Sequence, residues 1–228
     1  MKGLAGEAFV AIWHDIVAEG QAEFQAWHTR EHMPERLSVT GFLRGRRYRA
    51  EDGAPEYFNL YEVQTAAVLT SAEYLSRLNN PTPWTQRALP HFRNVSRSLC
   101  RLGASVGRGQ GGVMLTESFE AAPGADGALG LFLADHALPK ISDRPGILGA
   151  HFGIADRPSS EITTAERKAR GDLTRVPGWV ILLEAVSVSA ALDAGRDLAA
   201  IEARGAQGPV TRAVYRLECS LARAGSIG

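Results

Sequence analysis

The chain has little cysteine, no long apolar run and no excess of charge of either sign. Its two cysteines, Cys100 and Cys219, are too few for a disulfide framework or a cysteine-built zinc site. No apolar run approaches the roughly 20 residues that a membrane helix needs, and 25 basic side chains balance 25 acidic ones. We therefore expect neither a membrane nor a nucleic acid as partner. The first residues, where His14 and Asp15 interrupt a short apolar stretch, make a poor signal peptide, so we expect a soluble, cytoplasmic protein.

The remaining composition is that of ordinary globular proteins, and the 228 residues contain an internal similarity. Hydrophobic residues make up 45% and charged residues 22%, which excludes the disordered and coiled-coil classes. Three pairs of segments match in the same order. They are EHMPERLSVTGFLRG from Glu31 with DHALPKISDRPGILGA from Asp135, which has one more residue before the proline; YFNLYEV from Tyr57 with WVILLEAV from Trp179; and VSRSLCRL at 95–102 with VTRAVYRL at 210–217. We therefore expect two copies of one unit.

Hydrophobic periodicity predicts the order strand, helix, strand, strand, helix, strand in both halves. The first-half strands are expected at 8–14, 42–49, 56–63 and 95–104, with helices at 20–37, 71–78 and 84–90. The second-half elements are expected at 112–119, 128–143, 147–154, 178–186, 189–204 and 210–221, and the polar stretch 156–176 has only a short turn as its first-half counterpart. We therefore divide the chain into a first repeat at 1–106 that bears the site, a glycine-rich linker at 107–112 and a degenerate second repeat at 113–228.

A βαββαβ unit forms a four-stranded antiparallel sheet with both helices on one face, and a second copy can cover the other face. The expected fold is α+β, with two tandem ferredoxin-like βαββαβ repeats that form a pseudo-dimeric α/β barrel. With WHTREHMPERL at 27–37 and GFLRGRRY at 41–48, this arrangement resembles the EthD-like and muconolactone-isomerase-like branch of the dimeric α/β-barrel superfamily. That resemblance implies a small cytoplasmic protein, in a group that includes lactone isomerases, cofactor-free monooxygenases, polyketide cyclases and haem-binding enzymes. Fold alone does not select one of these reactions.

Polar residues lie on the stripe of the first helix that is expected to face the sheet. Trp27, His28 and Glu31 follow Phe24 at the spacing of a buried helix face, and His32 borders that face. A buried imidazole or carboxylate needs a partner or a cavity. We therefore predict a pocket here, and the alternative is that His28 and Glu31 are structural hydrogen-bonding partners.

The second half favours a pocket that is confined to the first half. Our alignment places Leu131 and Phe132 opposite Trp27 and His28, so the second copy has lost the first histidine, while it retains Asp135 and His136.

His28, Glu31 and His32 also form the pattern H-x-x-E-H, in which two histidines one turn apart can hold zinc. Zinc needs a third protein ligand, and His14 at the end of the first strand is the one candidate that the expected geometry allows. Because only one helix supplies the histidine pair and no cysteine or carboxylate cluster completes the set, we expect no metal.

The second strand carries four arginines within six residues. Strand alternation places Arg44, Arg46 and Tyr48 on one face and Arg47 and Arg49 on the other. A guanidinium in a pocket binds a carboxylate or an enolate with two hydrogen bonds, so we predict that Arg44 and Tyr48 bind substrate. Which face lines the pocket stays open, and the alternative is a solvated edge paired with the acidic residues near Glu51.

The third strand and the chain after it add polar and aromatic candidates. Asn59 and Tyr61 share one face with Tyr57, and the aligned second-half residues are apolar, so Asn59 and Tyr61 are predicted to orient a carbonyl or stabilise an oxyanion. His14 and Trp27 are predicted to contact the substrate, and Trp84 to cap the pocket. Packing roles for the aromatic residues are the alternative.

These residues predict a cofactor-independent enzyme for a small lactone-like or aromatic-derived metabolite, with proton transfer by histidine. His28 or His32 would be the base or acid, because the imidazole pKa of about 6.5 allows both protonation states near neutrality. Glu31 would orient the imidazole. Isomerase, lyase and cofactor-free oxygenase chemistry stay open, and a homo-oligomer is compatible with the sequence. The alternative is a non-catalytic module of the same fold for ligand binding or assembly.

Overall fold

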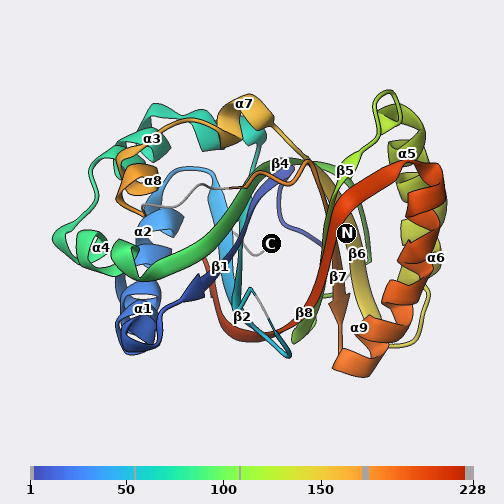
Figure 1. Cartoon of the computed structure of the whole chain (residues 1–228), viewed down its shortest axis with the longest axis horizontal. Helices are drawn as coiled ribbons and strands as arrows, with labels where there is room; N and C mark the ends of the chain where they lie inside the picture. The colour runs from blue at the N-terminus through green and yellow to red at the C-terminus, as the bar shows by residue number, and fades with distance from the viewer. Residues whose placement is uncertain (1–2, 54, 108, 171–174, 224–228) are drawn as a thin grey trace.

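Within the described residues, eight antiparallel strands close into a barrel, and the helices lie outside it in two groups (Figure 1). The computed structural model describes residues 3–53, 55–107, 109–170 and 175–223. The strands are β1 (Ala8–Ile16), β2 (Phe42–Ala50), β3 (Tyr57–Val63), β4 (Phe92–Gly107), β5 (Val113–Ala121), β6 (Ile147–Ala155), β7 (Trp179–Ala185) and β8 (Ala206–Ala222). Their order around the barrel is β1-β3-β2-β8-β5-β7-β6-β4. The fold is thus mixed α+β, as expected.

The two halves of the chain, residues 3–107 and 109–223, contribute equivalent arcs to the barrel. The first half runs β4-β1-β3-β2 and the second β8-β5-β7-β6. The halves meet where β2 pairs with β8 and β4 pairs with β6, so they join edge to edge and their inner faces meet as the barrel interior. Residue 108 of the expected linker lies outside the described residues.

β4 and β8 are longer than the expected 95–104 and 210–221 because each serves both arcs. β4 pairs with β1 over Phe92–Arg101 and with β6 over Cys100–Gly107. β8 pairs with β5 and then with β2 in the same way. The extra residues of these two strands close the barrel.

The alternation along β1 separates two buried environments. Phe9, Ala11 and Trp13 pack inside the barrel, whereas Ala8 and Val10 pack outward beneath the helices. Both faces of the strand are buried, so Trp13 and His14 are neighbours in sequence that lie on opposite sides of one sheet.

Helices cover the outer face of each arc. The first half has η1 (Ala18–Gly20), α1 (Gln21–Trp27), the π turn η2 (His28–His32), α2 (Met33–Ser38), η3 (Ala66–Thr70), α3 (Ala72–Asn79), α4 (Pro83–Ala88) and η4 (Leu89–His91). The second half has α5 (Asp126–Phe132), the π turn η5 (Leu133–Ala137), α6 (Leu138–Ser142), α9 (Val188–Gly195) and η6 (Arg196–Arg204). No helix in the described part of the chain is long and apolar enough to cross a membrane.

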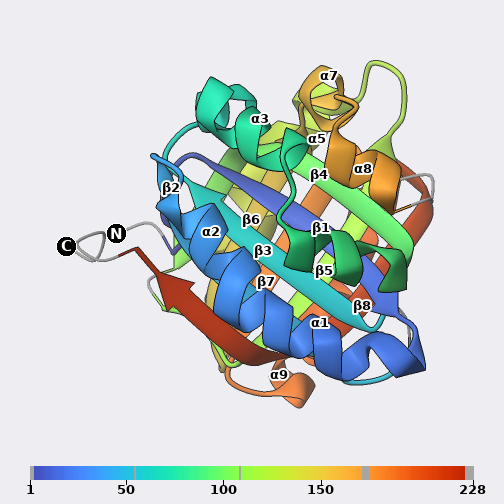
Figure 2. The ribbon, with the colours of Figure 1, turned by 90° about the vertical axis from the view of Figure 1, so that its left-hand side faces the viewer.

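The polar stretch 156–176 forms two further helices, α7 (Arg157–Ser160) and α8 (Ala165–Ala169), although residues 171–174 fall outside the described part. These helices belong to the second half of the sequence but lie over the first half. α8 packs against α3 and η4, and α7 packs on β4 (Figure 2). α7 and α8, which have only a short turn as their first-half counterpart, therefore form a cover for the first half.

Candidate functional site

Polar side chains from β1, β3 and the long first helix meet between the outer face of the sheet and the helix. Asn59 and His14 lie on neighbouring strands, and their side chains join through Nδ2 and Nε2 at 2.8 Å. The Tyr61 hydroxyl contacts Nε2 of His28 at 3.0 Å. The rings of His28 and His32 lie 5.6 Å apart, centre to centre. The structure therefore brings five of the expected polar residues into one buried cluster: His14, His28, His32, Asn59 and Tyr61.

A π turn gives the histidines their direction. His28–His32 forms one π-helical turn between α1 and α2, and π turns are frequent at functional sites. Its wider winding directs both His28 and His32 into the protein, where they are 2% and 6% exposed.

Glu31 is directed away from the imidazoles, contrary to its expected orienting role. Its carboxylate Oε1 accepts hydrogen bonds from the hydroxyls of Thr82 at 2.5 Å and Thr85 at 3.3 Å. These threonines lie at the start of α4, so Glu31 ties α4 to the first helix. The i, i+3, i+4 pattern of an ordinary α-helix had placed Glu31 beside His28, and the π turn removes it from that face.

Arg47, rather than Arg44, is the arginine of β2 that reaches the cluster. Its Nη1 lies 3.3 Å from Nδ1 of His28 and donates to Thr29 at 3.0 Å, while its Nε donates to Glu218 at 2.9 Å. Strand alternation predicted the two faces of β2 correctly but left open which face served the pocket.

Arg44 and Tyr48 point into the barrel, so the expectation that they line the histidine pocket is wrong. Arg44 donates to Glu62 at 2.5 and 2.8 Å, and Arg46 links Glu62 to Glu184 at 2.9 and 3.0 Å. Tyr48 packs in the apolar interior of the barrel. The sheet separates all these side chains from His28. The two arginines and the two glutamates form an internal ionic network that joins the two halves.

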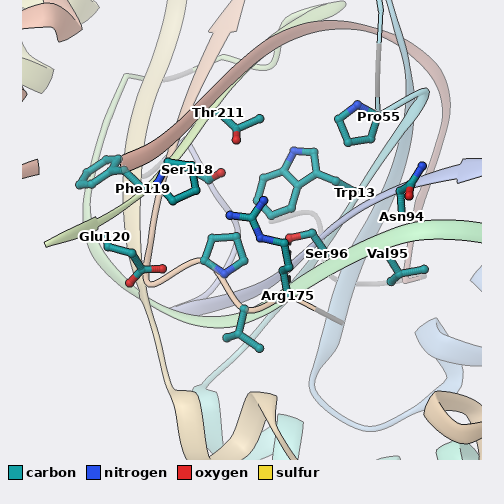
Figure 3. A pocket seen from close by; sticks show the side chains of 13 residues that line it. Trp13, Pro55, Asn94, Val95, Ser96, Ser118, Phe119, Glu120, Arg175 and Thr211 are labelled. Carbon is teal, nitrogen blue, oxygen red and sulfur yellow. Dashed lines mark hydrogen bonds between the residues drawn. The ribbon is translucent and has the colours of Figure 1, made fainter. Parts of the chain in front are cut away.

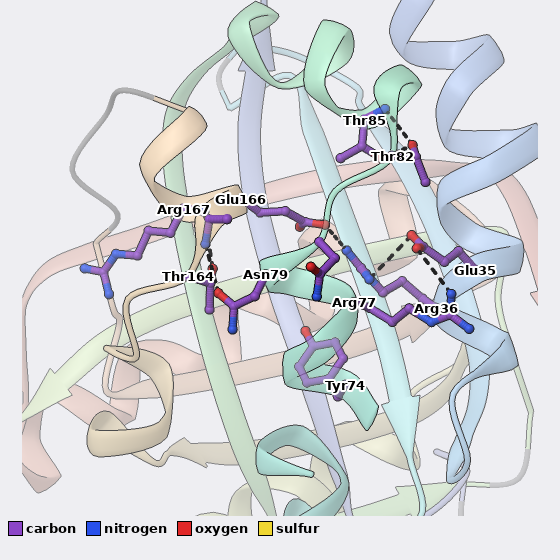
Figure 4. Close-up of polar contacts among 12 residues, drawn as sticks. Glu35, Arg36, Tyr74, Arg77, Asn79, Thr82, Thr85, Thr164, Glu166 and Arg167 are labelled. Carbon is purple, nitrogen blue, oxygen red and sulfur yellow. Dashed lines mark hydrogen bonds and ion pairs between the residues drawn. The ribbon is translucent and has the colours of Figure 1, made fainter. Parts of the chain in front are cut away.

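The cover from the second half closes the cluster. Glu166 of α8 makes a buried ion pair with Arg36 of α2 (Figure 4). Asn79 at the end of α3 accepts from the amide of Ala165, which holds the start of α8. Arg170 lies over the ring of Phe92, 5.5 Å from its centre. Arg36, Glu166 and Arg170 are site residues that sequence reasoning missed, because their partners lie far away in the sequence, 130 residues in the case of Arg36 and Glu166.

A small cavity remains in the centre of the cluster. Its volume is about 10 Å³, which is close to the minimum for one water molecule. Trp27 and Arg170 are among the residues that line it. Three buried polar atoms of the cluster have no hydrogen-bond partner among the described residues: His14 Nδ1, His32 Nδ1 and Asn59 Oδ1. Buried polar atoms are usually satisfied, so a water or a ligand group is expected here.

The electrostatics keep the histidines neutral. Burial, and then the Arg170 guanidinium, lower the pKa of His14 to about 3. Burial and Arg47 hold the pKa of His28 well below its usual value, and burial and Arg36 do the same for His32. The expectation that these imidazoles populate both protonation states near neutrality therefore gives way to rings that are neutral near pH 7, each with one N–H and one nitrogen lone pair.

The two tryptophans differ in position. The Trp27 indole is buried against His32, and its Nε1 donates to Thr85 at 3.1 Å. Trp84 lies on the outside of α4, where its Nε1 donates to Glu23 at 2.7 Å. Trp27 thus lines the cavity, and its contact with a substrate stays a prediction. Trp84 does not line the cavity, because the turn into α4 directs its ring towards α1.

The described residues contain no group of three or more His, Cys, Asp or Glu side chains placed to hold a metal. Haem-binding proteins belong to the group that the sequence resembles, but the arrangement does not fit a porphyrin. The cavity is about 10 Å³, and Nε2 of His28 is already bound to the Tyr61 hydroxyl.

The π turns also correct the sequence alignment of the halves. η2 begins at His28 and η5 at Leu133, and each is followed by a helix with proline as its second residue, Pro34 or Pro139. Leu133, rather than Phe132, is therefore the counterpart of His28, and no extra residue precedes the second proline. By the same register, His136 corresponds to Glu31.

No family model matches the sequence, and no curated protein matches it either. Solved structures with similar folds exist at low identity. An anthrone oxidase-like protein is 13% identical, with a TM-score of 0.65 over 97% of this chain and 94% of that chain. A protein from Fusobacterium nucleatum whose name proposes a monooxygenase is 8% identical, with a TM-score of 0.61 over 96% and 95%. A chlorite dismutase mutant from Candidatus Nitrospira defluvii is 8% identical, with a TM-score of 0.54 over 92% of each chain. These likenesses show the fold alone, which is that of the dimeric α/β-barrel proteins.

Proposed function

We propose that the chain is a small-molecule enzyme of the oxygenase type that removes a proton from a lactone-like or aromatic-derived metabolite without a cofactor. The observation that carries this proposal is the buried set of neutral histidines beside guanidinium groups, with two unpartnered polar atoms, His32 Nδ1 and Asn59 Oδ1, on residues that line a common cavity. Neutral imidazole is a base, and a nearby cation stabilises the anion that forms when the substrate loses its proton.

The roles divide between the helix and the sheet. His28 or His32 accepts the proton, and Arg47, next to His28, stabilises the resulting enolate or phenolate. Asn59 and Tyr61 orient the carbonyl or hydroxyl oxygen. The names of the structural neighbours, anthrone oxidase-like and monooxygenase, favour a substrate anion that then reacts with O2. The isomerase and lyase alternatives share the first step, the proton abstraction.

Entry of a substrate requires the cover to move. A cavity of about 10 Å³ admits no metabolite, and ligand pockets commonly measure about 300–1,000 Å³. Arg170 and α8 lie over the cluster, and one buried ion pair, Arg36 to Glu166, fixes α8 to α2. We infer that displacement of α8 with Arg170 opens the site, in the manner of other active-site lids.

Two probes with acidic C–H bonds test the proposal. Anthrone in air-saturated buffer with EDTA should be oxidised to anthraquinone, with uptake of one O2 and release of one water, followed by absorbance and an oxygen electrode. A butenolide in D2O should exchange its acidic proton for deuterium, followed by NMR. We expect catalysis of at least one reaction by the wild-type protein and its loss in His28→Leu.

The control is His136→Ala, which changes an exposed histidine of the second half. Equal loss of catalysis in His136→Ala and His28→Leu would contradict the proposed site. Absence of both reactions with the wild-type protein would contradict the acidic C–H substrate class.

A non-catalytic module for ligand binding or assembly is the second candidate, and the closed cavity is the observation that favours it. In that case His28 and its partners are a polar part of the core. The wild-type protein should then catalyse neither reaction, and His28→Leu should lower only the free energy of unfolding. Catalysis by the wild type that is lost in His28→Leu would instead support the enzyme.

We also propose finer assignments that follow the sequence resemblance. The two arcs are taken as tandem ferredoxin-like repeats, 1–106 and 113–228, joined by the linker 107–112, in a cytoplasmic protein of the EthD-like branch. The shared strand order of the arcs and the π turn at the same place in each support the repeat. A circularly permuted chain that opens between β4 and β5 and joins the present ends should keep the fold if the arcs are independent copies.

A further inference from the structure

A second and larger cavity opens at one end of the barrel, on the inner side of the sheet. Its volume is about 510 Å³, within the range of small-molecule pockets. Trp13 of β1 lies at its centre, whereas the next residue, His14, belongs to the histidine cluster on the other side of the same strand (Figure 3). This cavity is therefore separate from the proposed active site.

The aromatic floor of the cavity is held rigidly. The Trp13 indole is 4% exposed, its Nε1 donates to Thr116 at 3.1 Å, and its ring packs on Phe58 with 5.2 Å between the ring centres. A fixed indole face binds a flat ring with little loss of conformational entropy.

A guanidinium faces this indole. The Arg175 side chain points into the cavity towards Trp13 (Figure 3). Its main chain is held against β4, because Arg97 N donates to the Arg175 carbonyl at 2.8 Å and Arg175 N donates to the Val95 carbonyl at 3.3 Å. Within the described residues, the guanidinium has no hydrogen-bond or ion-pair partner, so it is free to bind an anion.

The other charged group of the lining is already neutralised. Glu120 pairs with Arg157 and accepts from the amide of Gly178 at 3.0 Å. The hydroxyls of Ser118 and Thr211 also face the cavity and add neutral hydrogen-bonding groups (Figure 3). The cavity thus combines one available positive charge with a flat aromatic surface.

We propose that this barrel-end cavity binds a planar aromatic monoanion of one or two rings, with the ring on Trp13 and the carboxylate or sulfonate on Arg175. A guanidinium binds such an anion with two parallel hydrogen bonds. This site does not depend on the proposed enzymatic function.

Titration calorimetry of the full chain with 2-naphthoate and with its uncharged isostere 2-naphthamide tests the proposal. We expect saturable binding of the acid, about tenfold tighter than that of the amide. Arg175→Gln changes an exposed residue and should remove this difference. Arg196→Gln, which changes an exposed arginine outside the cavity, should preserve it.

An NMR titration places the ligand. The indole N–H resonance of Trp13, identified by its absence in Trp13→Phe, should shift with the acid. His28→Leu should bind 2-naphthoate as the wild type does. The proposal is overturned if the acid does not bind saturably, if acid and amide bind equally, if Arg175→Gln binds unchanged, or if His28→Leu alone loses binding.

Discussion

The two arcs of the barrel place opposite chemistry at equivalent positions. His14 pairs with Tyr57 on β1 and β3, and Phe119 pairs with Trp179 on β5 and β7, so the strand registers correspond. The cluster positions of the first arc are His14, His28, His32, Arg47, Asn59 and Tyr61, and their counterparts are Phe119, Leu133, Ala137, Phe152, Ile181 and Leu183. All six counterparts belong to one buried apolar cluster.

This difference shows that the backbone does not require the polar set. The second arc packs the same space with apolar side chains, which is the cheaper solution because buried polar groups lose their hydration. The first arc also has a cover, α8, and no corresponding helix of the described residues packs over the second arc. A costly polar cluster beneath a separate cover supports the proposal that the site lies in the first arc.

Exchanging residues between the arcs should give the largest effect. Leu133→His buries an imidazole in an apolar cluster without partners and removes packing, so we expect a loss of roughly 3–5 kcal/mol in the free energy of unfolding. The reciprocal His28→Leu should cost roughly 1–3 kcal/mol, because Tyr61 and Arg47 lose a partner. Urea unfolding measures both. Equal costs would mean that the two environments are not distinct.

Removing the ion pair of the cover should have the next largest effect. Glu166→Gln leaves Arg36 buried, and Glu35, at 3.6 Å, is then its one acidic partner among the described residues. We expect a loss of about 2–3 kcal/mol, because an uncompensated buried charge is costly. Faster hydrogen exchange confined to α8 and its contacts would support a moving cover.

The matched control is Arg144→Gln, which breaks the more exposed pair with Asp197 in the second half. Its loss should be much smaller, because exposed pairs contribute little. A similar loss in both variants would contradict the difference in burial.

The sequence predicts the strands, the helices and the polar helix stripe, because these depend on local periodicity. The match of 95–102 with 210–217 places Leu99 opposite Val214. The strand register agrees, because Leu99 pairs with Val10 of β1 and Val214 pairs with Leu115 at the equivalent position of β5. The face of β2 that lines the site was not predictable, because both faces are buried in a closed barrel. The contribution of Glu166 was not predictable either, because its partner Arg36 lies 130 residues away.

Acid should destabilise the first arc more than the second. The folded pKa of His14 is about 3, and the pKa values of His28 and His32 are also lowered by burial, whereas the unfolded value is about 6.5. The unfolded chain therefore binds more protons, and stability is lost as the pH falls from about 6.5 towards the folded pKa. Between pH 7 and pH 5 the loss should be about 2 kcal/mol for each histidine that stays neutral in the fold.

His14→Phe, which introduces the residue found at Phe119, isolates one of these contributions. The variant should lose about 2 kcal/mol less than the wild type between pH 7 and pH 5, measured by urea unfolding at both pH values. Burial raises the pKa of Glu35, Glu117 and Glu184, and this opposes acid destabilisation, but equally in both proteins. If His14→Phe and the wild type lose the same free energy of unfolding between pH 7 and pH 5, His14 is protonated in the folded protein at pH 5.

The smallest effect is expected at Glu31 and His136, an aligned pair whose side chains do not join the buried clusters of the two arcs. Glu31 and His136 occupy the same place in the two π turns; His136 is exposed, and Glu31 faces the threonines of α4 rather than the imidazoles. His136→Ala should therefore change the free energy of unfolding by less than about 0.5 kcal/mol. Glu31→Gln keeps an oxygen that accepts from Thr82, so its cost should stay below about 1 kcal/mol and proton exchange from the substrate should continue. If Glu31→Gln instead abolishes proton exchange while the fold stays intact, Glu31 reaches the imidazoles once the cover opens. Its assignment as only a link between the first helix and α4 would then be wrong.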